Sequence, residues 1–158
     1  MKTQRNFFVV LIVLALLSVS GISVVSAATT CTFTVTGTSM KLNGNCTTDE
    51  TIYVPQGFTL NGQGHTILVT DPAGDSFKGA VVKNAGTVAH VINLRIRAPN
   101  LAVACHSYPD YLTGIWFENA RGSIKNNTIV ALFQTDSGCQ EGDAIVAENT
   151  GAYVNVEI

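Results

Sequence analysis

The stretch Thr51–Val69 constrains the fold more than any other part of the chain. It reads TIYVPQGFTLNGQGHTILV, and residues typical of tight turns divide it into three short runs typical of β-strands. Three strands and two corners in so short a stretch leave no room for a helix. A chain that turns twice without a hairpin signal is typical of one coil of a parallel β-solenoid, in which each strand pairs with its equivalent in the next coil. The expected strands are Thr51–Val54, Phe58–Leu60 and His65–Val69.

A similar pattern returns three times. Gly79–Asn84, Gly114–Asn119 and Ala144–Asn149 are apolar runs that end in asparagine, and the three asparagines are 35 and 30 residues apart. Small residues and a second strand-like run follow each of them. A β-sandwich is the alternative, but its strands would recur about every 8–12 residues and would be joined by hairpin turns. The repeat therefore favours an all-β solenoid of about three to four coils.

Alternation along these strands predicts which side chains enter the core, because successive side chains point to opposite faces. The expected inward positions are Ala80, Ile115, Ile145, Val82, Phe117 and Ala147. The expected outward positions are Val81, Trp116, Val146, Lys83, Glu118 and Glu148. Asn84, Asn119 and Asn149 are expected to stack at a corner, where amides can hydrogen-bond one another and the turn backbone.

The first 27 residues have the features of a signal peptide. Lys2 and Arg5 give a positive head, Phe7–Leu17 is uninterrupted apolar sequence, and Val25–Ala27 offers small residues for cleavage. A retained membrane anchor is the alternative, although serines and a glycine dilute the run before it reaches the length of a full span. The mature protein is therefore expected to be secreted, into the extracellular space or the periplasm.

Composition excludes two classes of partner. The net charge is −2 and only 13% of the residues are charged, so there is no basic footprint for nucleic acid and no polybasic patch for a membrane surface. About 130 residues after the leader are enough for one domain with its own core. Residues 28–50 are expected to form a β cap on the first coil, and residues 51–158 the solenoid itself.

The four cysteines all follow the leader, which argues for disulfides in an exported chain. Three pairings are possible. Sequence proximity favours Cys31–Cys46 at the amino end and Cys105–Cys139 between two loops. Zinc binding is the alternative, but no paired CxxC spacing occurs and the histidines are scattered, so no metal site is expected.

The phrase TLNGQGHTI at Thr59–Ile67 resembles the opening coil of right-handed parallel β-helix proteins of the pectin-lyase-like superfamily. Weaker phrases of the same kind follow at Gly114–Asn119 and Asn126–Ile129. The resemblance covers essentially the whole mature chain and implies a right-handed parallel β-helix. It leaves the activity open, because the superfamily includes polysaccharide lyases and hydrolases, carbohydrate-binding surface proteins and a copper-site maturation protein.

Two long connections, Pro99–Leu112 and Phe133–Gly142, are expected to project from the same edge of the solenoid. They would bring polar and aromatic groups towards Trp116 and Glu118, and such a mixture suits the hydroxyls and C–H faces of a sugar. The alternative is a pair of solvated loops stapled for stability. The candidates on these loops are His106, Tyr108, Asp110, Tyr111, Gln134, Asp136, Gln140, Glu141 and Asp143. The expected partner is a polysaccharide or a cell-surface glycan.

A polysaccharide lyase or glycoside hydrolase is the alternative function. A hydrolase needs an acid and a base on two carboxylates, and the candidates are Asp136, Glu141 and Asp143. The phrases typical of polygalacturonases are absent. A lyase would want carboxylates around calcium, for which a stacked Glu118 and Glu148 would serve, although a surface charge row is the simpler interpretation. No cofactor is expected, with calcium as the option.

The carboxyl end, Ala152–Ile158, has the pattern of the second strand of a fourth coil. A solenoid that stops there would present apolar core and unpaired backbone. We expect either a truncated reading frame or a covering partner, including end-to-end association through this coil.

Overall fold

The computed structural model describes residues 29–102, 104–132, 142–151 and 155–158. All regular structure in these residues is β-strand, which confirms the predicted all-β class. No segment of them forms a helix able to cross a bilayer. The expected signal peptide, residues 1–27, lies outside the described residues and stays a prediction.

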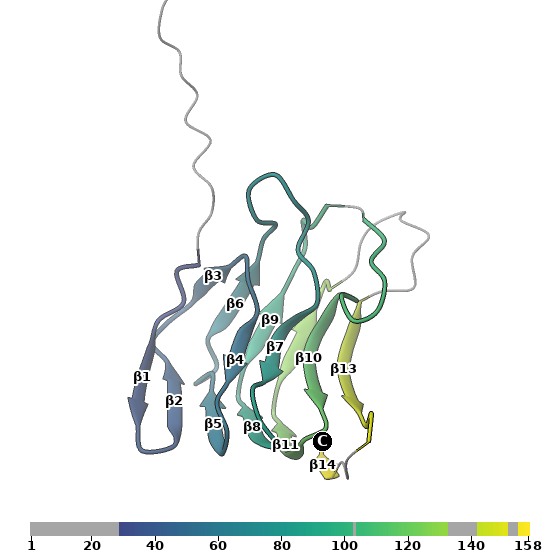
Figure 1. Ribbon diagram of the computed structural model, residues 1–158. Helices are drawn as coiled ribbons and strands as arrows, with labels where there is room; N and C mark the ends of the chain where they lie inside the picture. The colour runs from purple at the N-terminus through teal and green to yellow at the C-terminus, as the bar shows by residue number, and fades with distance from the viewer. Residues whose placement is uncertain (1–28, 103, 133–141, 152–154) are drawn as a thin grey trace, which may run out of the picture.

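The strands form three sheets that wind together as a parallel β-solenoid of about three turns (Figure 1). The sheet orders are β1-β2-β5-β8-β11-β14, β13-β10-β7-β4 and β12-β9-β6-β3. Every pairing is parallel except that of β1 with β2, which is the predicted amino-terminal cap. The bounds are β1 (Phe33–Thr36), β2 (Ser39–Leu42), β3 (Cys46–Thr48), β4 (Ile52–Val54), β5 (Phe58–Asn61), β6 (Thr66–Val69), β7 (Ala80–Asn84), β8 (Val88–Ile92), β9 (Arg95–Arg97), β10 (Thr113–Glu118), β11 (Arg121–Lys125), β12 (Thr128–Val130), β13 (Asp143–Glu148) and β14 (Asn155–Glu157).

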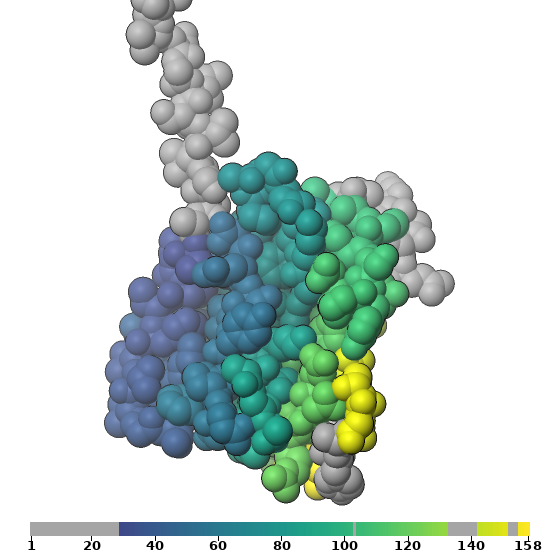
Figure 2. Space-filling model, viewed as in Figure 1, coloured from purple at the N-terminus to yellow at the C-terminus, as the bar shows by residue number. Residues whose placement is uncertain are grey.

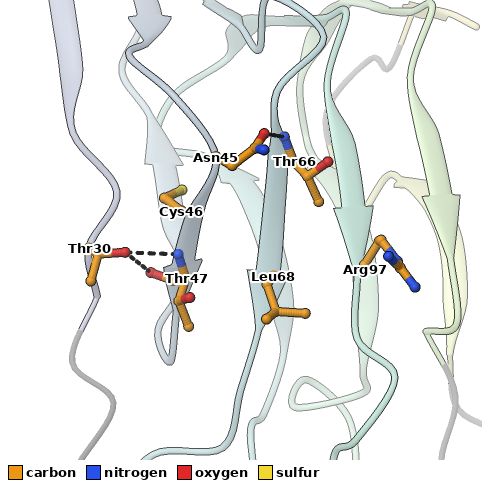
Figure 3. A pocket seen from close by; sticks show the side chains of 7 residues that line it. All are labelled: Thr30, Asn45, Cys46, Thr47, Thr66, Leu68 and Arg97. Carbon is orange, nitrogen blue, oxygen red and sulfur yellow. Dashed lines mark hydrogen bonds between the residues drawn. The ribbon is translucent and has the colours of Figure 1, made fainter.

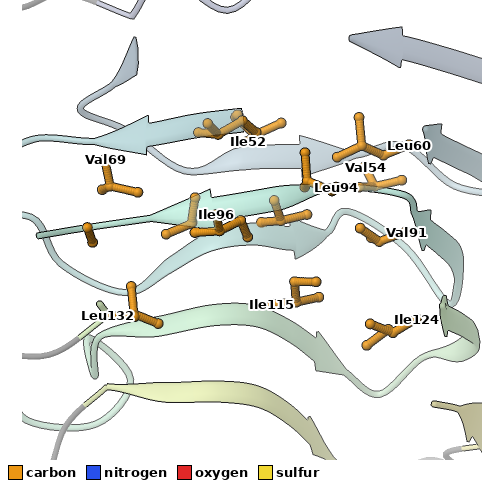
Figure 4. Packing of buried hydrophobic residues seen from close by; sticks show 14 of the residues in the cluster. Ile52, Val54, Leu60, Val69, Val91, Leu94, Ile96, Ile115, Ile124 and Leu132 are labelled. Atoms are coloured by element: carbon orange, nitrogen blue, oxygen red, sulfur yellow. The ribbon is translucent and has the colours of Figure 1, made fainter. Parts of the chain in front are cut away.

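The core lies between the three sheets and is built of apolar columns, one residue from each coil. Leu60, Val91 and Ile124 are in register on β5, β8 and β11, and Figure 4 shows them in successive layers. All three are at most 2% exposed. Burial of such side chains stabilises a fold by roughly 1.5–3 kcal/mol each. Because each coil contacts only its neighbours, these columns join one layer to the next together with the parallel strand pairings.

The faces predicted by alternation hold for β7 and for most of β10, but burial departs from them at three positions. Val81 and Trp116 point away from the core and are nevertheless only 0% and 2% exposed. At Trp116 the cover includes the ring of Tyr108, which lies in the segment before β10. Ala147 was expected inside and is exposed, since β13 is the outermost strand of its sheet.

The predicted stack of three asparagines is wrong at its first member. Ile115 pairs with Val82, so β10 follows β7 at a spacing of 33 residues and Asn84 lies opposite the Phe117 position inside the strand. The corner after β7 has three residues, whereas Asn119 and Ala120 alone form the corner after β10. Alignment on asparagine assumed corners of equal length, which the chain does not have.

Candidate functional site

The outer surface of the β4-β7-β10-β13 sheet carries a row of large side chains, one from each coil. Tyr53 pairs with Lys83, Lys83 with Trp116, and Trp116 with Val146. Neighbouring strands are about 4.8 Å apart, so this row follows the solenoid axis. We call the surface the aromatic face and define it by Tyr53, Lys83, Tyr108, Tyr111, Trp116, Glu118 and Glu148.

Trp116 is the centre of the aromatic face. Its ring lies 5.9 Å from the Tyr108 ring, and the Lys83 ammonium lies 4.5 Å from its centroid. These neighbours leave Trp116 only 2% exposed, which corrects the expectation of an exposed tryptophan. Alternation gave the direction of the side chain correctly, but it carries no information on a loop that folds back over it. The buried Nε1 donor has no hydrogen-bond acceptor among the described residues.

Charged groups surround this ring. Lys83 Nζ forms an ion pair of 2.8 Å with Glu118, and the Tyr108 hydroxyl donates a hydrogen bond of 3.2 Å to Glu148. Glu118 and Glu148 are neighbours in register on β10 and β13, as predicted. The hydrogen bond to the Glu148 carboxylate raises the pKa of Tyr108, and desolvation and the nearby negative charges raise it further.

Two connections meet beside the aromatic face, residues 70–79 between β6 and β7 and residues 98–112 between β9 and β10 (Figures 1 and 2). Asp71 joins them: one carboxylate oxygen accepts from Phe77 N and the other from Ala102 N, both at 2.7 Å. Gly79 N also donates to the Asp110 carbonyl at 2.9 Å. These bonds fix the segment that carries Tyr108.

The predicted loop candidates divide into four groups. Tyr108 and Tyr111 contact each other edge to face at 6.4 Å and belong to the aromatic face. His106 lies instead beside Ser76, with its Nε2 3.0 Å from the Ser76 Oγ, and Asp110 contributes its backbone to the junction of the connections. Asp143 is exposed at the start of β13. Gln134, Asp136, Gln140 and Glu141 lie outside the described residues.

The disulfide Cys31–Cys46 is present as predicted. Cys139 lies outside the described residues, so its pairing with Cys105 stays a prediction. In the part of the chain that the structure describes, no three His, Cys, Asp or Glu side chains are grouped closely enough to hold a metal ion. For calcium, the described residues offer the pair Glu118 and Glu148, and calcium binding remains an expectation.

Sequence reasoning missed Tyr53 and the connection 70–79. Tyr53 lies between the buried Ile52 and Val54, so the alternation used elsewhere would have placed it outside. Its alignment with Lys83 would have added it to the row. No sequence pattern indicated that Asp71 joins the two connections. Its carboxylate accepts hydrogen bonds from backbone N–H groups that come together only in the folded chain.

A second feature lies on the outer side of the β3-β6-β9-β12 sheet. It is a shallow hollow of about 400 Å3 lined by Thr30, Asn45, Cys46, Thr47, Thr66, Leu68 and Arg97 (Figure 3). Thr66 and Leu68 on β6 form its floor, between Thr47 on β3 and Arg97 on β9. The segment before β1 forms one wall, because Thr30 N donates to the Thr47 carbonyl at 2.8 Å.

Comparison of the chain with protein-family models, with curated proteins and with solved structures finds no match.

Proposed function

We propose that the protein binds a polysaccharide along its aromatic face. The observation that carries the proposal is that three half-exposed tyrosines lie on one side of the solenoid. Two of them are clustered at a buried tryptophan, and the third lies two strands away, beyond the lysine of a lysine–glutamate pair. Tyr53, Tyr108 and Tyr111 are 56%, 52% and 41% exposed. Such a surface offers planar apolar faces beside charged hydrogen-bonding groups, which is what sugar rings require.

The direction of the row supports an extended ligand. Tyr53 and Trp116 are two strands apart, roughly 10 Å along the solenoid axis, with Lys83 between them. A polymer lying along this axis would meet an aromatic ring, a cation and a second aromatic cluster in sequence. A compact ligand would contact only one of these groups, since the row runs over an outer surface.

Two broader assignments accompany this proposal. The parallel solenoid and the phrase Thr59–Ile67 support membership of the pectin-lyase-like superfamily. The Cys31–Cys46 disulfide and the expected leader support secretion. Together they favour an extracellular glycan as the ligand.

Trp116 makes the test direct, because it is the only tryptophan of the chain. Polysaccharides that bind on a glycan array are titrated into the protein while tryptophan emission is recorded. A ligand on the aromatic face should change the emission. Tyr53→Ala and Tyr108→Ala should each weaken binding about tenfold, as expected for central aromatic contacts.

Val35→Ala is the control, because Val35 is 58% exposed and lies on β1, at the edge of a different sheet from the row. Equal losses of polysaccharide affinity in Val35→Ala and Tyr53→Ala would contradict the proposal. The same samples are assayed for reducing ends and for unsaturated products. Turnover that is lost in Asp143→Ala would instead support the polysaccharide lyase or hydrolase.

A further inference from the structure

Two arginines on β9, Arg95 and Arg97, form a closely spaced pair of cations. Lys78, Lys83 and Lys125 each form an ion pair, with Asp75, Glu118 and Glu157 respectively. Arg95 and Arg97 are exposed and form no ion pair within the described part of the chain. The protein as a whole has a net charge of −2, so an unpaired cationic pair is a local feature and not a consequence of composition.

The two guanidinium groups share one surface. Ile96 between them is buried, so Arg95 and Arg97 both point outward, about 7 Å apart along the strand. No acidic residue occurs in the four strands β3, β6, β9 and β12. The outer side of this sheet therefore carries positive charge that no carboxylate on these strands neutralises.

Hydrogen-bonding groups flank the arginines in register. Thr66 and Thr128 lie on either side of Arg95, and Leu68 and Val130 lie on either side of Arg97. Leu68 and Val130 are 37% and 42% exposed. The hollow described above begins at Arg97 and extends over β6 to β3. Its floor is thus a patch of hydroxyls and methyl groups with the Arg97 side chain at one rim, and Arg95 is two residues before Arg97 on the same strand.

We propose that this surface, which we call the arginine face, binds an acidic saccharide through Arg95 and Arg97. A guanidinium fork matches the two oxygens of a carboxylate or sulfate group and forms paired hydrogen bonds with it. The threonine hydroxyls and the side chain of Leu68 suit the hydroxyls and C–H faces of the sugar ring that carries the anion. The volume of the hollow, about 400 Å3, lies within the usual range of ligand sites.

The chemistry favours a saccharide over nucleic acid. Nucleic-acid binding depends on neutralising many phosphates, and two arginines on a protein of net charge −2 supply little of that. The described strands of the arginine face also carry no aromatic ring on which a base could stack. The arginine face is a different side of the solenoid from the aromatic face, so this inference does not rest on the proposed function.

The test uses the whole chain of the printed sequence and three soluble polymers: a polyuronate, dextran sulfate and uncharged dextran. Affinity is measured by retardation in gels that contain each polymer, at low and at physiological ionic strength. We expect retardation by at least one of the two anionic polymers, weaker at higher salt, and none by dextran. The polymer that binds identifies the anion as carboxylate or sulfate.

Variants locate the site. Arg95→Gln with Arg97→Gln should weaken binding roughly tenfold or more, and Leu68→Glu should do the same by adding a negative charge to the floor. Arg121→Gln is the matched control, because Arg121 is an exposed arginine on another sheet and forms no ion pair with any residue that the structure describes. Thermal unfolding of each variant checks that the fold is unchanged.

Three results would overturn the inference. The first is an absence of retardation by both anionic polymers. The second is a loss of polymer binding in Arg121→Gln equal to that in the Arg95→Gln, Arg97→Gln double variant. The third is unchanged retardation of that double variant. Tyr53→Ala separates the two faces. Binding to anionic polymers that survives Tyr53→Ala and fails in the arginine variants supports the arginine face, whatever the outcome for the aromatic face.

Discussion

Gly122 is a residue at which the solenoid has no room for a side chain. It has a φ of 148° and faces inward between Ala89 and Val156, its partners in register. A Cβ added there would lie 1.7 Å from the Ala89 carbonyl oxygen, so two coils would have to separate. Gly122→Ala should lower the free energy of unfolding by about 3 kcal/mol or more, measured by chemical denaturation. Gly44→Ala, which meets no atom within 4 Å, should change it little.

Asn84 acts at the same scale through hydrogen bonds. It is 9% exposed, and its amide group donates to the Gly86 and Glu118 carbonyls while its oxygen accepts from Glu118 N. Removal of the amide would leave buried backbone groups without partners. Asn84→Ala should therefore destabilise the protein by about 1–3 kcal/mol in equilibrium unfolding. If the exposed Asn100→Ala has the same effect, the hydrogen bonds are not the cause.

At the scale of structural elements, the connections 70–79 and 98–112 hold Tyr108 over Trp116. Asp71→Ala removes the acceptor for Ala102 N, which joins residues 70–79 to residues 98–112, and the acceptor for Phe77 N within residues 70–79. We expect Trp116 to become accessible, with red-shifted emission and faster quenching by acrylamide. Asp75→Ala is the matched control, because its carboxylate bonds only Ser76 and Lys78 within its own connection. Identical quenching of Trp116 in the two variants would show that Asp71 does not hold Tyr108 over Trp116.

Alkaline pH tests the packing of Tyr108 against Trp116 through the hydrogen bond between Tyr108 and Glu148. The pKa of Tyr108 is raised from its usual 10.0 by the hydrogen bond to Glu148, so the folded protein holds this proton more tightly than the unfolded chain does. The stabilisation is complete below the unfolded pKa and is lost as the pH rises through the folded pKa. Deprotonation then places a phenolate beside Glu148 and should open the contact with Trp116.

We expect this opening as a transition in Trp116 emission at a pH above the usual pKa of tyrosine. Glu148→Gln removes the main cause of the shift and should move the transition to lower pH. Tyr108→Phe should abolish it. A transition that persists unchanged in Tyr108→Phe would mean that another group is responsible.

The contrast between strands and connections also explains what could be predicted from the sequence. The strand faces follow from alternation, which is a local property. Alternation is therefore enough to predict Ile115 and Ile96 as inward residues and Tyr53 as an outward one. The register of β7 against β10 was predicted two residues away from its position, because corner length is set by backbone geometry around Asn119, whose φ is 51°. The cover over Trp116 depends on contacts between two connections, and no local pattern encodes these.

At the scale of the whole molecule, the solenoid separates its chemistry by face. One side carries tyrosines around Trp116, and another carries Arg95 and Arg97 over a hollow. Each sheet repeats its strand in every coil, so side chains of one kind can gather along a face without any long-range signal in the sequence. The two proposed ligand sites can thus be tested independently, by variants on separate faces of the solenoid.

The same architecture predicts how the molecule unfolds when its first disulfide is removed. Cys31–Cys46 joins the segment before β1 to β3 and closes a loop of 15 residues, for which the chain-entropy model gives about 3 kcal/mol. Because coils contact only their neighbours, the loss in Cys31→Ala with Cys46→Ala should fall mainly on the cap and the first coil. Amide hydrogen exchange should quicken in β2 and β3 and change little in β10. Thr30→Ala, which removes only side-chain hydrogen bonds to Thr47, should have a small effect. A uniform rise in exchange through all three sheets would show instead that the solenoid unfolds as one cooperative unit.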